Sequence, residues 1–185
     1  MRDMVIDRDK SLLLLVDMQE RLLPAVIDSE RTLRKAGLLA AAAERMNIPI
    51  LVSEHYPKGI GPTSEGLSCK VSADSFMQKI HFSCFAEDEC RRRIVAAARK
   101  QVVVGGTETH VCVQQTALDL KQAGYDVFVT ADATSSRHET DKNLAVARMR
   151  AAGIVIVSAE MVVFEWMGRA DTPLFREMLA LIKEA

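Results

Sequence analysis

The sequence is poor in the residues that mark disordered or repetitive chains. Its 185 residues include only nine glycines and five prolines, and no low-complexity tract interrupts them. Hydrophobic residues make up 49% of the chain and charged residues 26%, which is enough to bury a core and stay soluble. Since a domain usually contains roughly 100–200 residues, we expect residues 1–185 to form a single domain.

The sequence also lacks a long hydrophobic run and an excess of charge of one sign. No apolar run approaches the roughly 20 residues that a membrane helix needs. The apolar run 12–16, which follows a segment of mixed charge, is too short for the centre of a signal peptide. A formal net charge of −1 gives no reason to expect a basic face for nucleic acid. We therefore expect a small-molecule substrate as the partner, with no nucleic acid and no membrane.

Cysteine is scarce as well. The four cysteines are Cys69, Cys84, Cys90 and Cys112, and none of them forms a Cys-x-x-Cys pair. This spacing is not that of a disulfide framework or of a zinc site. Because free thiols persist in a reducing compartment, we expect a cytoplasmic protein.

Short apolar segments alternate with longer helical patterns along the rest of the chain. Strand–helix–strand repetition of this kind predicts a parallel sheet that is covered by helices on both faces. The fold class that we expect is α/β, a three-layer, doubly wound, Rossmann-like domain around a mainly parallel six-stranded sheet. The expected strands are 11–17, 48–53, 76–79, 101–105, 125–130 and 154–157, and the expected helices are 31–46, 88–100, 113–123, 139–152, 160–168 and 173–183.

Three chemically reactive residues lie at the ends of expected strands. Asp17 ends the first strand, Lys79 lies at the end of the third, and Cys112 opens the helix after the fourth. In doubly wound sheets ligands bind beyond the carboxyl ends of the strands, so the fold would gather these residues on one edge. A helix N-terminus and a nearby ammonium would lower the pKa of the Cys112 thiol. A carboxylate can accept the thiol proton and return it, so the set suits acyl transfer.

Each of these residues also has a purely structural interpretation. Asp17 with Glu20 matches a variant of the helix capping box. Lys79 by itself suits a solvated surface lysine, and Cys112 followed by Val suits a small buried apolar residue. The spacing of the residues does not decide between the two interpretations.

Several segments resemble those of one enzyme family. Residues 106–116 (GTETHVCVQQT) resemble the nucleophile motif of the isochorismatase-like cysteine hydrolases, which include nicotinamidases and N-carbamoylsarcosine amidases. Residues 14–19 (LLVDMQ) look like the first strand of that family, and residues 78–85 (QKIHFSCF) look like its lysine segment. Residues 130–137 (TADATSSR) resemble the segment after the fifth strand, and residues 55–63 (HYPKGIGPT) are similar to those of a subgroup of hydrolases. The likeness covers most of the chain and implies the isochorismatase-like hydrolase fold.

The resemblance implies a role for each residue at the strand ends. Cys112 would be the nucleophile, Asp17 the general base, and Lys79 the cation that supports the charged pair. It also implies a cis peptide at Thr107–Glu108, with the backbone N–H groups of Val111 and Cys112 forming an oxyanion hole. The implied reaction is attack on an amide or related carbonyl, loss of an amine or ammonia, and hydrolysis of the resulting thioester.

One segment departs from the metal-binding nicotinamidases. Those enzymes carry an Asp-x-His motif after the second strand and another His soon afterwards. This chain has Ser53, Glu54 and His55 there, and its next histidine is His81. Because a divalent site needs several convergent ligands, we expect no catalytic metal and no cofactor, which disfavours nicotinamide as the substrate.

Other functions fit the same likeness. Isochorismatases proper hydrolyse a vinyl ether without a cysteine, so Cys112 favours carbon–nitrogen hydrolysis over that reaction. A second possibility is a catalytically idle member of the family that binds a partner, and a third is a redox thiol protein. The intact set of three reactive residues counts against the idle member, and the missing second cysteine beside Cys112 counts against the redox protein.

The assembly is expected from the same likeness, and the pocket from the residues near the strand ends. Relatives often form symmetric oligomers, so we expect a homo-oligomer. The apolar residues Phe164, Trp166 and Met167 would either pack in the core or form a subunit contact. The residues that we expect to line the substrate pocket are His55, Tyr56, Ile60, His81 and Phe82, with the free thiol of Cys84 nearby.

Overall fold

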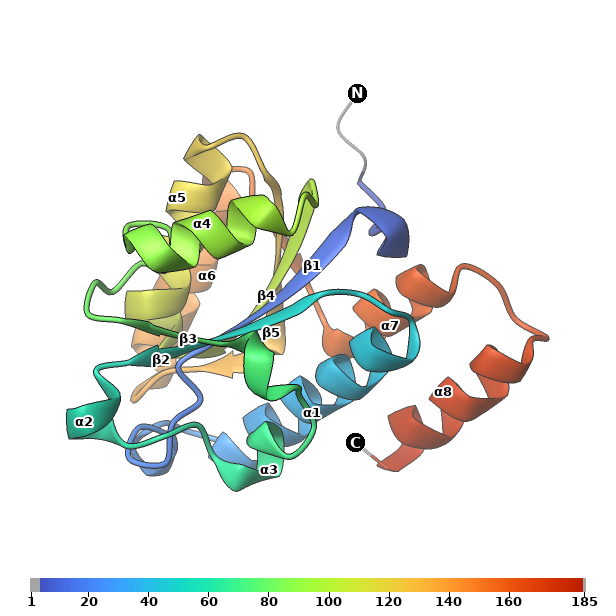
Figure 1. Ribbon diagram of the computed structural model, residues 1–185, viewed down its shortest axis with the longest axis horizontal. Coiled ribbons are helices and arrows are strands. Elements are labelled where there is room, and N and C mark those ends of the chain that lie inside the picture. Colours follow the sequence, from blue (N-terminus) through green and yellow to red (C-terminus); the bar gives the residue numbers. More distant parts are fainter. Residues whose placement is uncertain (1–3, 185) are drawn as a thin grey trace.

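The computed structural model describes residues 4–184 and is built around a parallel sheet (Figure 1). Within these residues the sheet has six strands in the order β3-β2-β1-β4-β5-β6, and every neighbouring pair is parallel. The predicted α/β fold class is therefore confirmed. The strands are β1 (Ser11–Val16), β2 (Ile50–His55), β3 (Phe76–Lys79), β4 (Gln101–Thr107), β5 (Asp126–Ser135) and β6 (Val155–Val157).

Helices cover both faces of the sheet (Figure 1). One face packs against α1, α7 and α8, and the other packs against α4, α5 and α6. None of the helices within residues 4–184 is both long enough and apolar enough to cross a lipid bilayer. The helices are α1 (Ser29–Arg45), α2 (Pro57–Ile60), α3 (Glu65–Ser68), α4 (Asp88–Ala96), α5 (Gln114–Gln122), α6 (Glu139–Ala151), α7 (Ala159–Met167) and α8 (Pro173–Glu184).

Strand β1 divides two hydrophobic cores. Its six residues are all buried, and successive side chains alternate between the faces of the sheet. Leu12 and Leu14 pack on the side of α4 and α5, whereas Leu13 and Leu15 pack on the side of α1 and α7. Burial of one such side chain stabilises the fold by roughly 1.5–3 kcal/mol. This two-sided burial explains why the segment is apolar without alternation.

Two predicted boundaries are displaced by residues with positive φ. Asn47 has φ 55° and ends the turn after α1, so β2 begins at Ile50 and not at the predicted residue 48. Ala98 has φ 51°, which is incompatible with a continuing helix, so α4 ends at Ala96 and does not reach residue 100.

Strand β5 is longer than the sequence pattern predicts. It continues to Ser135, beyond the predicted end at residue 130, and pairs again with β4 after a shift in register. Because the extension contains polar residues, a search for apolar segments does not predict it. The Asp132 carboxylate, for example, accepts a hydrogen bond from the Ala159 N–H at 2.8 Å, which fixes the start of α7.

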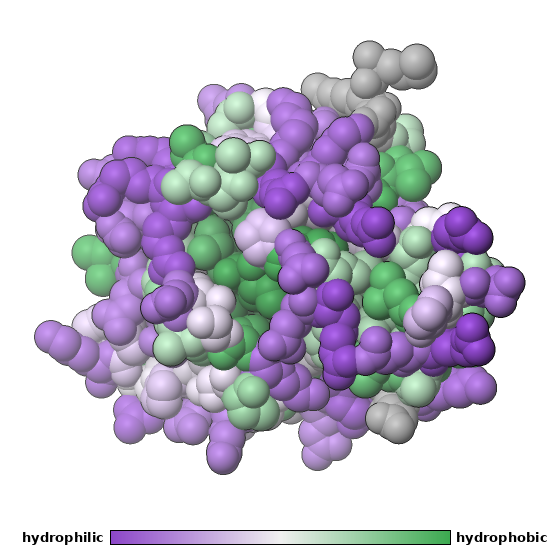
Figure 2. Space-filling model, turned by 45° about the vertical axis from the view of Figure 1, so that its right-hand side comes forward, coloured by the Kyte–Doolittle hydropathy of each residue, from purple (hydrophilic) through white to green (hydrophobic). Residues whose placement is uncertain are grey.

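The C-terminal apolar cluster lies mostly in the core. Trp166 is 1% exposed, and its indole N–H donates a hydrogen bond to the Ser11 hydroxyl at 2.9 Å. Met167 is also buried, whereas Phe164 is partly exposed and contacts the ring of Phe175. Trp166 and Met167 therefore belong to the core and are not free to form a subunit contact. On the face shown in Figure 2, hydrophilic side chains surround a central hollow in which hydrophobic residues are visible.

The strand order places a topological switch between β1 and β4. From β1 the chain winds outward through β2 and β3, and it then returns to β4 and winds the other way through β5 and β6. Ligands bind at the carboxyl ends of the strands on either side of such a switch. Asp17 follows β1 and Cys112 follows β4 there, and Lys79 ends the edge strand β3.

Candidate active site

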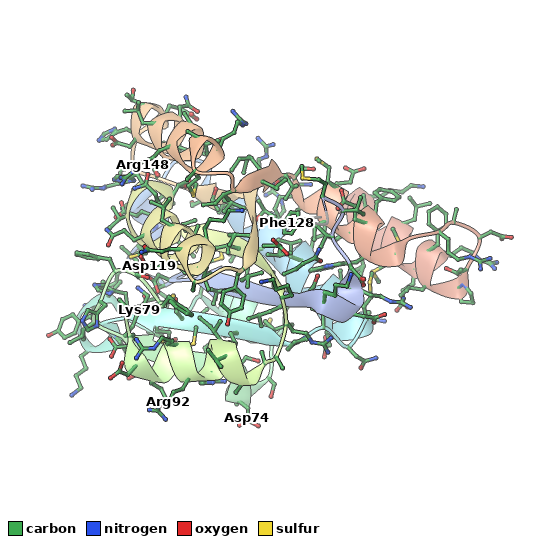
Figure 3. All side chains as sticks on the ribbon, turned by 90° about the horizontal axis from the view of Figure 1, so that it is seen from above. Asp74, Lys79, Arg92, Asp119, Phe128 and Arg148 are labelled. Atoms are coloured by element: carbon green, nitrogen blue, oxygen red, sulfur yellow. The ribbon has the colours of Figure 1, made fainter. Side chains whose placement is uncertain are left out.

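A buried ion pair joins the ends of two strands that are not neighbours. The Lys79 ammonium lies 2.6 Å from Oδ2 of Asp17, and both side chains are 0% exposed. Lys79 reaches across β2, which lies between β3 and β1 in the sheet. Figure 3 shows Lys79 at the end of the sheet that carries α2, away from α7 and α8. The interpretation of Lys79 as a solvated lysine is therefore wrong.

The backbone and side chain of Asp17 are both held by neighbouring strands. Its N–H donates to the Ser53 carbonyl at 3.0 Å, and its carbonyl accepts from the Thr107 hydroxyl at 2.6 Å. The Ser53 hydroxyl donates to Oδ1 of the carboxylate at 2.6 Å. Asp17 has φ 49° and begins no helix, so the capping-box interpretation is wrong. Each carboxylate oxygen has a donor, as a buried charge requires.

The ion pair keeps Lys79 charged. Burial, the largest single influence, would lower the pKa of Lys79, but the charge of Asp17, the neighbouring Cys84 and Cys112 and the hydrogen bond to Asp17 together outweigh burial, so the pKa is raised. The ammonium also donates to the carbonyl of His81 at 3.2 Å. The site therefore holds a permanent positive charge beside the carboxylate.

Cys112 lies beside this ion pair in a π-helix, Thr109–Val113, which leads directly into α5. Its side chain interacts with the Asp17 carboxylate, and the residue is 6% exposed. Burial and the negative charge of Asp17 raise the pKa of the Cys112 thiol, although Lys79 opposes them. The expectation of a lowered thiol pKa is therefore wrong, because burial and the carboxylate outweigh the ammonium. The resting site pairs a protonated thiol with a carboxylate.

The oxyanion hole is predicted in the segment that leads to Cys112. The Thr107–Glu108 peptide bond is cis. The Val111 N–H donates to the carbonyl of Glu108 at 3.1 Å, so this N–H already has a partner within the chain. The Glu108 carboxylate accepts from the Arg137 guanidinium at 2.7 Å. The role of the N–H groups of Val111 and Cys112 toward a substrate oxygen stays a prediction.

Cys84 places a second thiol beside the same carboxylate. It is completely buried, its N–H donates to the Thr116 hydroxyl at 2.9 Å, and its sulfur interacts with the hydroxyls of Ser53 and Thr116. Burial, followed by the charge of Asp17, raises the pKa of the Cys84 thiol to about 11. The two thiols differ in exposure, because Cys84 is 0% exposed and Cys112 is 6% exposed.

The residues expected to line the pocket fall into two groups. His55 ends β2, pairs in register with Lys79 on β3, and stacks on Phe82 with ring centroids 5.4 Å apart. His81 contributes its carbonyl to Lys79, but its ring is mostly exposed and lies 2.9 Å from the Glu87 carboxylate.

Tyr56 precedes the short helix α2, and Ile60 is its last residue; α2 follows β2 closely. The Tyr56 N–H donates to the Lys79 carbonyl at 2.9 Å, whereas its side chain is exposed. Ile60 is partly buried. These residues therefore stand at the rim of the site, and their contact with a substrate stays a prediction.

Gln19 is a structural residue of the site that the sequence pattern does not reveal. Its side-chain amide donates to the carbonyls of His55 at 3.0 Å and Gly61 at 2.6 Å, and its oxygen accepts from the His55 N–H at 2.7 Å. Gln19 thereby fixes the loop that carries His55 and α2 to the segment after Asp17. The only signal in the sequence is its place two residues after Asp17.

The carboxylate of Glu54, which could be a metal ligand, takes part in a structural contact. It accepts from the Thr63 N–H at 2.7 Å and from the Thr63 hydroxyl at 2.9 Å. No cluster of three or more His, Cys, Asp or Glu side chains placed to hold a metal ion occurs within residues 4–184. The reaction without a metal stays a prediction.

Comparisons with known proteins place this geometry in a family. Residues 11–161 match the family model described as Isochorismatase domain. The chain is 34% identical over 176 residues to Isochorismatase domain-containing protein 2 of Xenopus laevis, covering 94% of this chain and 84% of that protein.

Solved structures share the fold over almost the whole chain. The MAR1 ribonuclease from Caenorhabditis elegans is 31% identical with a TM-score of 0.90, and the match covers 97% of this chain and 92% of that one. The ycaC gene product from Escherichia coli, described as an octameric hydrolase of unknown specificity, is 24% identical with a TM-score of 0.89. That match covers 100% of this chain and 90% of the other.

Proposed function

Because the chain belongs to the isochorismatase family of hydrolase domains, we propose that it hydrolyses a small amide, carbamoyl or related carbon–nitrogen substrate through Cys112. The observation that carries the proposal is the buried Asp17 carboxylate, which lies between the Lys79 ammonium and the Cys112 thiol. A nucleophile, a base and a cation at one carboxyl edge of the sheet suit acyl transfer.

The state of the thiol defines the first step. Since the Cys112 thiol is protonated at rest, its sulfur can attack a carbonyl carbon only as the proton moves to Asp17. The sulfur–carbon bond forms while the carbonyl π bond opens onto the oxygen. Lys79 balances the negative charge on the carboxylate before the transfer.

The remaining steps return the site to its starting state. Asp17 gives the proton to the nitrogen as the carbon–nitrogen bond breaks, which releases an amine or ammonia and leaves a thioester on Cys112. Asp17 then takes a proton from water as the water oxygen attacks the thioester. The proton returns to the sulfur when the acid product leaves.

Replacement of Cys112 tests the proposal directly. In a screen of small amides and carbamoyl compounds, Cys112→Ala is expected to lower kcat/KM by about 10³-fold or more, since members of a catalytic set act as a unit. Cys69→Ala is the matched control, because Cys69 is an exposed thiol outside the site and its loss should leave hydrolysis unchanged. Intact-protein mass spectrometry should detect the thioester in wild type. Hydrolysis that survives in Cys112→Ala would show that another group is the nucleophile.

Two results of the same screen would contradict the amide proposal. One is cleavage of RNA, and the other is no turnover of any compound. A short RNA belongs in the same screen, because the Caenorhabditis elegans structure bears that name. The burial of Asp17, Lys79 and Cys112 favours a small substrate that fits into the site over a polymer that must lie across it. Cleavage of RNA that is lost in Cys112→Ala would replace the amide proposal, and no turnover of any compound would favour the idle member.

We also propose that the chain forms a homo-oligomer. The Escherichia coli neighbour, whose fold this chain shares, is described as octameric. Ile80 and Phe82 beside the site are 71% and 51% exposed, and apolar side chains of this kind are commonly buried between subunits. Native mass spectrometry at micromolar concentration should show an assembly, and a monomer alone would contradict this proposal.

A further inference from the structure

The side chain of His55 lies on the same face of β2 as Ser53, which contacts the candidate base Asp17. Side chains two residues apart on a strand point to the same face, so His55 shares its face with Ser53 and Leu51. Leu51 packs in the same core cluster as Cys112, and the Ser53 hydroxyl binds the Asp17 carboxylate. His55 therefore lies two residues after Ser53 on the same face of β2, at the carboxyl end of the strand.

The neighbours of the ring fix its position over the site. His55 pairs in register with Lys79 on β3, and its ring stacks on Phe82 with an interplanar angle of 28°. Gln19 holds the backbone of His55 on both its N–H and its carbonyl. Strand β3 and Gln19 thus fix the backbone of His55, and Phe82 packs against its ring.

One ring nitrogen of His55 is buried without a partner. Within residues 4–184, only two buried side-chain polar atoms lack a hydrogen bond, and Nδ1 of His55 is one of them. Burial and then the charge of Lys79 lower the pKa of His55, so the ring is neutral and carries one N–H. The main chain of His81 favours protonation of this ring, as a carbonyl that accepts a ring N–H does. Because Nδ1 is buried without a partner, we assign that N–H to Nε2, which leaves a lone pair on Nδ1.

We propose that Nδ1 of His55 accepts a hydrogen bond from an N–H of the substrate, which makes His55 a specificity-determining residue. The substrate class is then a primary or secondary amide, or a carbamoyl compound that retains an N–H, in preference to an ester or a tertiary amide. This inference rests on the proposed function, because it assigns the group that recognises the nitrogen side of the same substrate. A buried acceptor left without a donor discriminates strongly against a ligand that lacks one.

Two α,β-unsaturated probes test this preference without requiring turnover. N-methylacrylamide and methyl acrylate have the same heavy-atom skeleton and differ by an N–H in place of an oxygen. In each probe the Cys112 sulfur bonds to the terminal carbon, the carbon–carbon π bond breaks, and the thiol proton ends on the neighbouring carbon. The rate of adduct formation at Cys112 is measured by peptide mass spectrometry and divided by the rate with glutathione, which removes the difference in intrinsic reactivity.

Wild type is expected to prefer N-methylacrylamide over methyl acrylate by about tenfold or more after this normalisation. His55→Phe keeps a ring that can stack on Phe82 but removes the acceptor, and it should bring the preference close to one. His138→Leu is the matched control, because His138 is an exposed histidine at the start of α6, and it should keep the wild-type preference.

The outcomes separate this inference from the proposed function. Equal normalised rates for both probes in wild type would overturn the role of His55 and leave Cys112 as the nucleophile, and this result needs no variant to fold. A preference that persists in His55→Phe would also overturn it. If Cys112 forms no adduct with either probe, the proposed function fails and the inference fails with it.

Discussion

Replacement of Asp17 by Asn should make Cys112 react faster with a simple alkylating agent while it stops hydrolysis. In wild type the carboxylate raises the pKa of the thiol, second only to burial, and Lys79 opposes it. Asparagine removes the negative charge and leaves the ammonium unpaired, so the thiol pKa should fall. Hydrolysis needs the carboxylate as a proton acceptor, whereas iodoacetamide needs only the thiolate.

The size of the effect follows from two opposing factors. Removal of a nearby like charge lowers a pKa by about 1–3 units, and each unit raises the thiolate fraction about tenfold at a pH below both values. A less basic thiolate is also a weaker nucleophile, with a Brønsted coefficient of about 0.4–0.5, so the net gain is about 3.5-fold per unit. The expected increase in the alkylation rate of Cys112 at neutral pH is therefore about 3-fold to 40-fold.

Peptide mass spectrometry after timed exposure to iodoacetamide measures this rate. Exposed Cys69, in the same digest, is the internal reference, since its rate should not change between wild type and Asp17→Asn. Circular dichroism establishes that the variant is folded. Slower alkylation of Cys112 in folded Asp17→Asn would refute the reasoning, because it would mean that the carboxylate activates the thiol even without a substrate.

Two further predictions concern the free energy of unfolding, measured by urea titration. Lys79→Met leaves the buried charge of Asp17 unpaired and should lower the free energy of unfolding by about 3–5 kcal/mol. The double variant Lys79→Met/Asp17→Asn should lose less, because it no longer buries that charge. Equal losses in the single and double variants would mean that the pair does not act as a unit. Gly106→Ala should prevent stable folding, because Gly106 has φ +127° and an added Cβ would lie 2.0 Å from the Val16 carbonyl oxygen. At Gly124 no atom lies within 4 Å of an added Cβ, so Gly124→Ala should fold, with a modest loss of unfolding free energy because φ is +93°. Similar losses in Gly106→Ala and Gly124→Ala would show that the close approach of Gly106 to Val16 does not matter for folding.

The order and type of the main elements could be predicted from the sequence because they depend on local patterns. Buried strands such as β1 are continuous apolar segments, and amphipathic helices such as α1 repeat with helical periodicity. Boundaries were less predictable. The extension of β5 is polar, and the positive φ of Asn47 and Ala98 is set by how their neighbours pack.

The candidate catalytic residues could also be predicted, since Asp17, Lys79 and Cys112 follow strands and lie in motifs that resemble those of one family. The sequence determined which residues these are and indicated that they lie near one edge of a sheet. Their contacts depend on strand order, because Lys79 at the end of β3 meets Asp17 after β1 by reaching across the single strand β2.

The tertiary structure alone decided the electrostatics and the supporting contacts. The Ser53 hydroxyl and the Gln19 amide reach partners that are 36 residues or more away in the chain, so no local pattern marks them. The direction of the Cys112 pKa depends on burial weighed against a carboxylate and an ammonium from two other strands. The sequence names the groups that can react, but their charge state is set by distances that exist only once the sheet has formed.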